Sequence, residues 1–90
     1  MKILKFSAEW CKPCAQLAKS LEGTLIGAFI TPVDCDDDPE GLCEKYSVRN
    51  IPTILYLTDK GEELGRLVGS VSVKQIQDAY DKYAVSKKNR

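Results

Sequence analysis

The chain has 90 residues, which is enough for one small domain and too few for two. Apolar residues make up 43% and charged residues 29%, a composition typical of globular proteins and not of disordered or membrane-spanning ones. Thirteen basic residues balance thirteen acidic ones, which argues against a general nucleic-acid binder. The chain contains no histidine. This excludes Ser-His-Asp and Cys-His catalysis and every metal site that needs a histidine.

The N-terminal segment does not have the pattern of a secretion or membrane signal. Lysines interrupt its apolar residues, so the apolar run is shorter than the core of a signal peptide. No stretch approaches the about 20 apolar residues of a membrane-spanning helix. We therefore expect a cytoplasmic protein that does not associate with membranes. In that compartment, cysteines serve catalysis, metal binding or packing more often than structural disulfides.

Apolar runs predict four strands, over residues 2–7, 28–33, 53–58 and 64–68. The first run carries apolar residues at both parities, which is typical of a central strand covered on both faces. Pro32 favours an edge position for the second strand, because proline cannot donate a ladder hydrogen bond.

Three helices are predicted between and after these strands. Residues 11–21 carry apolar side chains at helical spacing. A short helix is expected to begin at about Pro39, with Asp38 as its N-cap. Ser72 and Gln75 form a capping box that opens the last helix. The buried stripe of that helix is expected to contain four residues: Val73, Ile76, Tyr80 and Tyr83.

The predicted order is therefore βαβαββα, in one domain over residues 1–90. The first strand, helix and second strand should form a right-handed parallel unit. Residues 59–62 suit a hairpin turn that adds antiparallel strands. We expect an α/β fold with one four-stranded mixed sheet and helices on both faces.

Cys11 and Cys14 stand three residues apart, where the first strand gives way to the helix over 11–21. Unpaired backbone N–H groups and the helix dipole favour the thiolate of Cys11, and Lys12 adds a positive charge. Cys14 lies one turn deeper, so we expect Cys11 to be the exposed nucleophile and Cys14 the resolving thiol. Pro13 limits the conformations of the loop. Two buried apolar cysteines or half of a zinc site are the alternatives, but the βαβ setting favours redox chemistry.

Several segments, in the right order, resemble the thioredoxin family: residues 6–14, 33–39 and 46–53, together with Gly61 and Gly69. The similarity runs from about residue 2 to residue 84. It implies a thioredoxin-like fold and dithiol–disulfide exchange, in which Cys11 attacks a substrate disulfide and Cys14 resolves the mixed disulfide.

The resemblance also implies that the Ile51–Pro52 peptide bond is cis, although only about 5–6% of X-Pro bonds in folded proteins are. A flat apolar surface around the nucleophile would then bind extended segments of substrate proteins. Its implied residues are Trp10, Lys12, Pro13, Ile51, Pro52 and Gly69.

The chain departs from the family at several places. We expect it to lack the additional N-terminal strand and helix of typical thioredoxins, and Lys12 replaces the usual glycine. Lys5 stands in the place of a buried acid, and Pro32 in that of the lysine that often pairs with it. Lys5 is therefore expected either to modulate proton transfer to and from Cys14 or to extend its amine into solvent.

We expect a protein disulfide reductase of the thiol–disulfide oxidoreductase class, because Pro13 before Cys14 resembles the reducing members of the family. The dithiol is the redox centre, and no organic cofactor or metal is required. The resemblance implies disulfide-bonded protein substrates, a thioredoxin reductase as electron donor and a monomer. A glutaredoxin-like, glutathione-dependent reductase and a non-catalytic binding module of the same fold are the alternatives.

Cys35 and Cys43 lie outside the motif. Cys35 ends a predicted strand and Cys43 lies beside apolar residues of a predicted helix. We expect both to be buried free thiols. A regulatory disulfide or an oxidation site is the alternative.

Overall fold

The computed structural model describes residues 1–88, and their side chains as far as residue 84. The elements follow in the order β1 (Lys2–Ser7), α1 (Lys12–Leu21), α2 (Leu25–Ala28), β2 (Ile30–Asp34), α3 (Leu42–Lys45), β3 (Thr53–Leu57), β4 (Glu63–Val68) and α4 (Val73–Lys88). The predicted βαβαββα order is confirmed, with α2 as an additional short helix.

One mixed sheet has the strand order β2-β1-β3-β4. β1 pairs in parallel with β2, and β3 pairs antiparallel with both β1 and β4. Pro32 lies on the edge strand β2, as predicted. An edge strand pairs on one side alone, so it tolerates a residue that has no N–H to donate. β1 lies inside the sheet and leads directly to the segment before α1.

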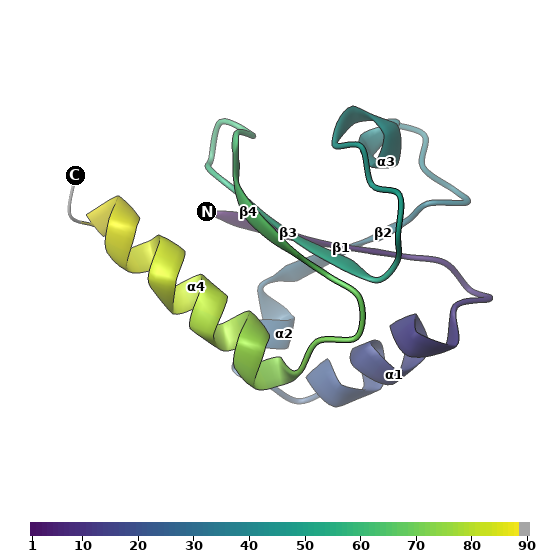
Figure 1. Ribbon diagram of the computed structural model, residues 1–90, viewed down its shortest axis with the longest axis horizontal. Coiled ribbons are helices and arrows are strands. Elements are labelled where there is room, and N and C mark those ends of the chain that lie inside the picture. Colours follow the sequence, from purple (N-terminus) through teal and green to yellow (C-terminus); the bar gives the residue numbers. More distant parts are fainter. Residues whose placement is uncertain (89–90) are drawn as a thin grey trace.

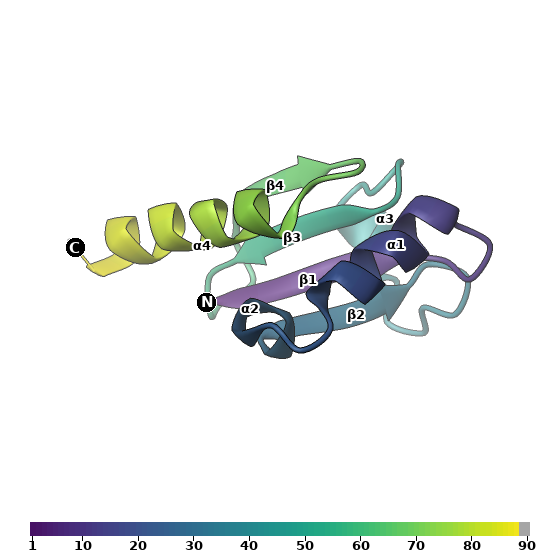
Figure 2. The ribbon, with the colours of Figure 1, turned by 90° about the horizontal axis from the view of Figure 1, so that it is seen from below.

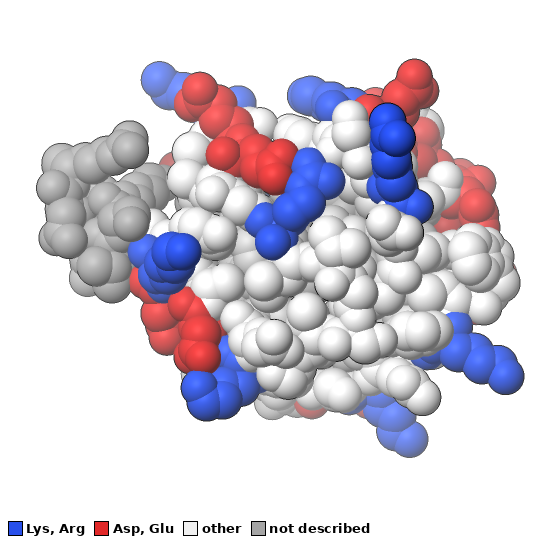
Figure 3. Space-filling view, in the orientation of Figure 1, with Lys and Arg blue, Asp and Glu red and all other residues white. Residues whose placement is uncertain are grey.

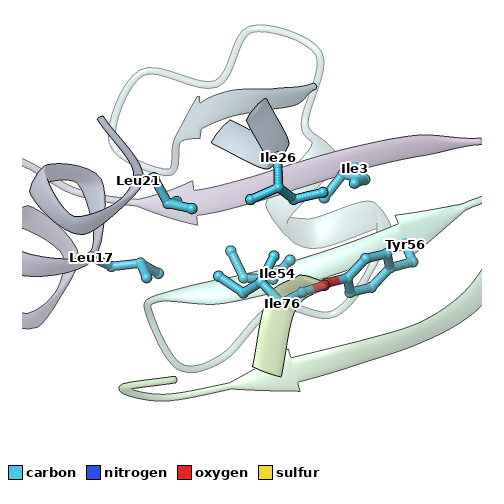
Figure 4. Close-up of a cluster of buried hydrophobic side chains, with 7 residues drawn as sticks. All are labelled: Ile3, Leu17, Leu21, Ile26, Ile54, Tyr56 and Ile76. Carbon is cyan, nitrogen blue, oxygen red and sulfur yellow. The ribbon is translucent and has the colours of Figure 1, made fainter. Parts of the chain in front are cut away.

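Helices cover both faces of the sheet, as predicted. In Figure 1 α1, α2 and α4 lie on one side of the strands and α3 on the other, and Figure 2 shows the first three in front of the sheet. Alternate residues of β1 serve the two faces: Ile3 belongs to the core under α1, α2 and α4, and Leu4 and Phe6 to the core under α3. Figure 4 shows the larger cluster, in which Ile54 and Ile76 are fully buried.

The α4 predictions are largely confirmed. The Ser72 side chain accepts a hydrogen bond from the Gln75 backbone N–H at 3.1 Å, and the Gln75 side chain accepts one from the Ser72 N–H at 2.8 Å. Ile76 is buried, while Val73, Tyr80 and Tyr83 are half-buried against the same core. None of the helices within residues 1–88 has the length and apolar composition needed to cross a bilayer.

Two element boundaries differ from the prediction. The helix expected from Pro39 begins only at Leu42, because Gly41 before it has a left-handed φ of 66° that breaks a helical run. The carboxylate of Asp38 still accepts a hydrogen bond from the backbone N–H of Cys43, at 2.8 Å. The second strand begins at Ile30, since residues 25–28 form α2 instead.

The prediction that Cys35 and Cys43 are buried free thiols is wrong. The two residues form a disulfide, with their Cα atoms 5.9 Å apart, and both are partly exposed. The backbone N–H of Cys35 donates to the Ser7 carbonyl at 2.9 Å, which fixes Cys35 beside the end of β1. The chain then turns back, so that Cys43 on α3 lies close to Cys35, at a Cα separation that suits a disulfide.

Candidate active site

A second disulfide, between Cys11 and Cys14, closes the start of α1. Cys11 is the N-cap residue, and its Sγ accepts a hydrogen bond from the Cys14 backbone N–H at 3.2 Å. Its own N–H donates to the Ala8 carbonyl at 3.1 Å, which turns the chain from β1 into the helix. Pro13 lies in the first helical turn, where no intrahelical N–H bond is needed. In the reduced protein, an N–H group aimed at the Cys11 sulfur favours its thiolate.

The start of β3 and the end of β4 complete the surroundings of Cys11. The Ile51–Pro52 peptide bond is cis, as the family resemblance implied. The Ile51 carbonyl oxygen lies 3.9 Å from the Cys11 Sγ, and Ile51 packs against both cysteines. The Gly69 N–H donates to the Pro52 carbonyl at 2.9 Å, and Gly69 has a φ of 92° that favours glycine.

Trp10 is 71% exposed beside the nucleophile, and its indole Nε1–H donates to the Asp36 carboxylate at 2.8 Å. Lys12 and Pro13 are exposed, Ile51 is half-buried and Pro52 is buried. The structure thus places Ile51 against Cys11 and links Gly69 to the adjoining Pro52, while the Trp10 indole is held toward the β2–α3 connection.

Sequence reasoning missed Asp36 and Val68. An exposed indole next to a reactive cysteine needs an acceptor to hold it, and the acidic run over 36–38 could have suggested one. Val68 is 51% exposed at the end of β4, next to Gly69. The alternation of side chains along the strand was the available signal for this residue.

Uncharged residues surround the site on the α1 side. A hollow of about 320 Å³ lies between α1 and the β4–α4 connection, with eight uncharged residues around it: Pro13, Gln16, Leu17, Ser20, Ser70, Val71, Ser72 and Gln75. Figure 3 shows a largely uncharged area over this part of the molecule, with charged side chains around it. Such a surface suits peptide segments of varied sequence.

A separate hollow of about 230 Å³ lies beneath α1, and both Lys5 and Cys14 line it. Ser7, Glu9 and Asp34 contribute polar groups to the same lining. Burial lowers the pKa of Lys5 from its ordinary value. The structure therefore brings Lys5 and Cys14 to the lining of one hollow.

The expected difference in exposure between the two active-site cysteines is wrong. Cys11 is only 5% exposed and Cys14 is 3% exposed. Ala8 and Ile51 cover the disulfide, so burial does not distinguish the two sulfurs. Their surroundings do: Cys11 lies against the Ile51 carbonyl, and Cys14 against the hollow that contains Lys5.

The family model for thioredoxin matches residues 1–82. The chain is 40% identical over 70 residues to a thioredoxin of Chlamydia caviae, a match that spans 74% of this chain and 67% of that protein. It is 34% identical over 87 residues to a thioredoxin of Staphylococcus epidermidis, spanning 92% and 82% of the two chains. A solved mutant thioredoxin from Halobacterium salinarum superposes with a TM-score of 0.77 at 27% identity, over 90% of this chain and 72% of that one. The chain belongs to the thioredoxin family.

Family membership and the Cys11–Cys14 pair together define the activity class. The protein is a thiol–disulfide oxidoreductase that reduces protein disulfides by dithiol–disulfide exchange. Within the described part of the chain, no group of three or more Cys, Asp or Glu residues is arranged to hold a metal ion.

Proposed function

We propose that Cys11 is the attacking thiolate and Cys14 the resolving thiol of this thioredoxin-family reductase. The observation that carries the proposal is the position of the Cys11 sulfur, at the start of α1 and 3.9 Å from the Ile51 carbonyl. The Cys14 N–H that reaches Cys11 supports a thiolate at that sulfur, whereas Cys14 lies one turn further into the helix.

The exchange moves two electrons. The Cys11 thiolate attacks one sulfur of the substrate disulfide, the substrate S–S bond breaks, and the other substrate sulfur leaves as a thiolate. Cys14 then loses its proton and attacks the Cys11 sulfur of the mixed disulfide. This step releases the second substrate thiol and leaves the Cys11–Cys14 disulfide. The dithiol itself carries the electrons, so the reaction proposed here needs no organic cofactor or metal.

Substrate segments bind as extended chains across the residues around Cys11. Trp10 and Ile51 supply apolar contact, the Ile51 carbonyl faces the Cys11 sulfur, and the Gly69 backbone is joined to that of Pro52 by a hydrogen bond. Lys12 and Pro13 are exposed on the adjoining turn. The uncharged hollow between α1 and the β4–α4 connection extends this surface and supports broad rather than narrow substrate selection.

Lys5 modulates the proton that Cys14 must lose. It shares a hollow with Cys14, and burial lowers its pKa, so its neutral amine is more populated than that of an exposed lysine. The neutral amine accepts the proton as a base. The family resemblance implies a carboxylate in this role. An amine can take it only in its deprotonated form.

A thioredoxin reductase returns the Cys11–Cys14 disulfide to the dithiol, and the protein acts as a monomer in the cytoplasm. The uncharged surface around Cys11 supports transient contact with many protein disulfides, which a stable oligomer would cover.

Turnover with two electron donors tests this function. The reduced protein should reduce the disulfides of insulin in repeated cycles with NADPH and a thioredoxin reductase, and much more slowly with glutathione alone. The Cys11→Ser/Cys14→Ser variant, which keeps Cys35 and Cys43, is the matched control and should be inactive with both donors. Faster turnover with glutathione would indicate a glutaredoxin-like protein. No turnover with either donor would indicate a non-catalytic binding module.

A further inference from the structure

The Cys35–Cys43 disulfide takes no part in the exchange at Cys11 and Cys14. It joins the residue after β2 to the second residue of α3 and encloses the connection between them. Both cysteines are partly exposed, and we expect a reductant in solution to reach the bond from this side. Figure 3 shows acidic side chains gathered at the side of the molecule where Figure 1 places the β2–α3 connection.

The enclosed connection holds the active-site tryptophan. Asp36 follows Cys35 directly, and its carboxylate accepts the hydrogen bond from the Trp10 indole at 2.8 Å. The Asp36 backbone is itself fixed, since its N–H donates to the Asp34 carboxylate at 2.9 Å. The orientation of an indole that is 71% exposed therefore depends on the conformation of the residues that the disulfide encloses.

A packing contact forms a second route between the two disulfides. Cys35, Cys43 and Ile51 pack against the same buried cluster under α3. Ile51 also packs against Cys11 and Cys14, and its carbonyl faces the Cys11 sulfur. A change in the position of α3 would thus reach the nucleophile through Ile51.

We propose that Cys35–Cys43 is a second, reversible redox site, and that its reduction releases the Asp36 contact to Trp10 and slows the reduction of protein disulfides at Cys11. The effect on activity rests on the proposed role of Trp10 in substrate binding, whereas the redox site itself does not. Asp36 acts as a positioning residue through Trp10.

The chemistry is the exchange that this family performs, with the disulfide as the group that is reduced. One thiolate of an external dithiol attacks one of the two sulfurs, the Cys35–Cys43 bond breaks, and a mixed disulfide forms. The second thiol of the reductant then attacks the reductant sulfur of the mixed disulfide, and the protein sulfur leaves as a thiolate. The products are two protein thiols and the oxidised reductant, and two electrons and two protons have passed. A disulfide-containing oxidant reverses the reaction.

Trp10 is the sole tryptophan of the chain, so its fluorescence reports the coupling directly. The experiment uses the Cys11→Ser/Cys14→Ser variant, in which Cys35–Cys43 is the remaining disulfide. The protein is equilibrated in buffers of reduced and oxidised dithiothreitol at increasing reducing power. Tryptophan emission is recorded, and alkylation with mass spectrometry counts the free thiols.

We expect two labels to appear together, on Cys35 and Cys43, and to disappear again on reoxidation. Trp10 emission should shift to longer wavelength over the same range, because the indole loses its acceptor and gains water contacts. Adding Asp36→Ala should abolish the shift but not the labelling. Free thiols under every buffer, or none under the most reducing one, would overturn the redox site. Reversible labelling with constant emission would overturn the coupling to Trp10.

The effect on the reduction of protein disulfides is then tested with proteins that keep both Cys11 and Cys14. Asp36→Ala leaves both disulfides intact, and it should slow insulin reduction about threefold to tenfold, the effect of one lost hydrogen bond. Reduction of hydroxyethyl disulfide, which is too small to span the surface, should be unchanged. Asp37→Ala removes the same charge from the next residue and is the matched control, with parent rates expected. Equal slowing by Asp36→Ala and Asp37→Ala would show a charge effect and contradict the positioning role.

Discussion

Lys5 is a charged residue on an inner strand, in a fold whose neighbouring positions are almost all apolar. Its side chain lies on the face that α1 covers, and the adjacent hollow joins it to Cys14. The cost of partial burial lowers the pKa of the amine. At a given pH, a larger fraction of such an amine is neutral and available as a base than of a surface lysine. The reaction rate, and not the fold, should therefore reveal its role.

Replacing Lys5 with Met keeps the length and apolar packing of the side chain and removes the amine. We expect resolution of the mixed disulfide by Cys14 to slow at pH 7 by about tenfold or more, since general bases commonly contribute at least that much. The pH profile of resolution should shift upward, because deprotonation of Cys14 then depends on water and hydroxide. Rapid-mixing measurements with a preformed mixed disulfide give the rate directly.

Lys2→Met is the matched control, because Lys2 is an exposed lysine on the same strand and on the other face of the sheet. It should reproduce the parent profile. Superimposable profiles for the parent and Lys5→Met would contradict the role of the amine and leave water as the proton acceptor.

At the scale of elements, periodicity and capping predicted most of the fold. The fully buried β3 and the Ser72–Gln75 capping box follow from patterns that the tertiary structure does not overrule. Short elements were less predictable, because four residues carry no periodicity. α2 exposes Leu25 and buries Ile26 alone, so the side chain of Thr24, which caps it, was the main local signal.

The errors at the cysteines have a different cause. Cys11 and Cys14 were predicted as a pair because their spacing and setting are local features of the sequence. The Cys35–Cys43 bond depends on where the chain places the end of β2 relative to α3, and the left-handed Gly41 allows that turn. Spacing alone did not reveal this geometry. The burial of Cys11 by Ile51 likewise depends on a contact between residues 40 positions apart in the sequence.

Tyr56 joins β3 to α4 and shows how the helix is fixed to the sheet. It is fully buried, and its hydroxyl donates to the Ile76 carbonyl at 2.7 Å, as the position of its oxygen in Figure 4 indicates. We expect Tyr56→Phe to lower the free energy of unfolding by about 1 kcal/mol, the net value of one such hydrogen bond. Urea denaturation at pH 7 measures the difference.

Alkaline pH adds a second readout for Tyr56. Burial first, and the nearby Tyr83 second, raise the pKa of the Tyr56 hydroxyl above its ordinary value of 10.0. Above that pH the unfolded chain ionises while the folded protein keeps its proton, so the parent loses stability as pH rises. Tyr56→Phe should lose less over the same range. Tyr80→Phe, on α4, is the control, and an equal loss in both variants would contradict a specific role for the Tyr56 hydroxyl.

For the whole molecule, the fold brings distant segments together around the Cys11–Cys14 disulfide. β1 leads the chain into α1, the segment before β3 brings Ile51 to Cys11, and Gly69 after β4 is hydrogen-bonded to Pro52. The zero net charge and the uncharged area in Figure 3 suit a protein that meets many partners through apolar and backbone contacts.

The assignment of roles to Cys11 and Cys14 is tested most directly by trapping the covalent intermediate. Reduced Cys14→Ser and Cys11→Ser proteins are mixed with an oxidised protein substrate such as insulin, quenched with acid and analysed by non-reducing mass spectrometry. Cys14→Ser should accumulate a mixed disulfide through Cys11 that dithiothreitol dissolves, and Cys11→Ser should accumulate far less. Equal trapping by both variants, or more by Cys11→Ser, would contradict Cys11 as the attacking thiolate.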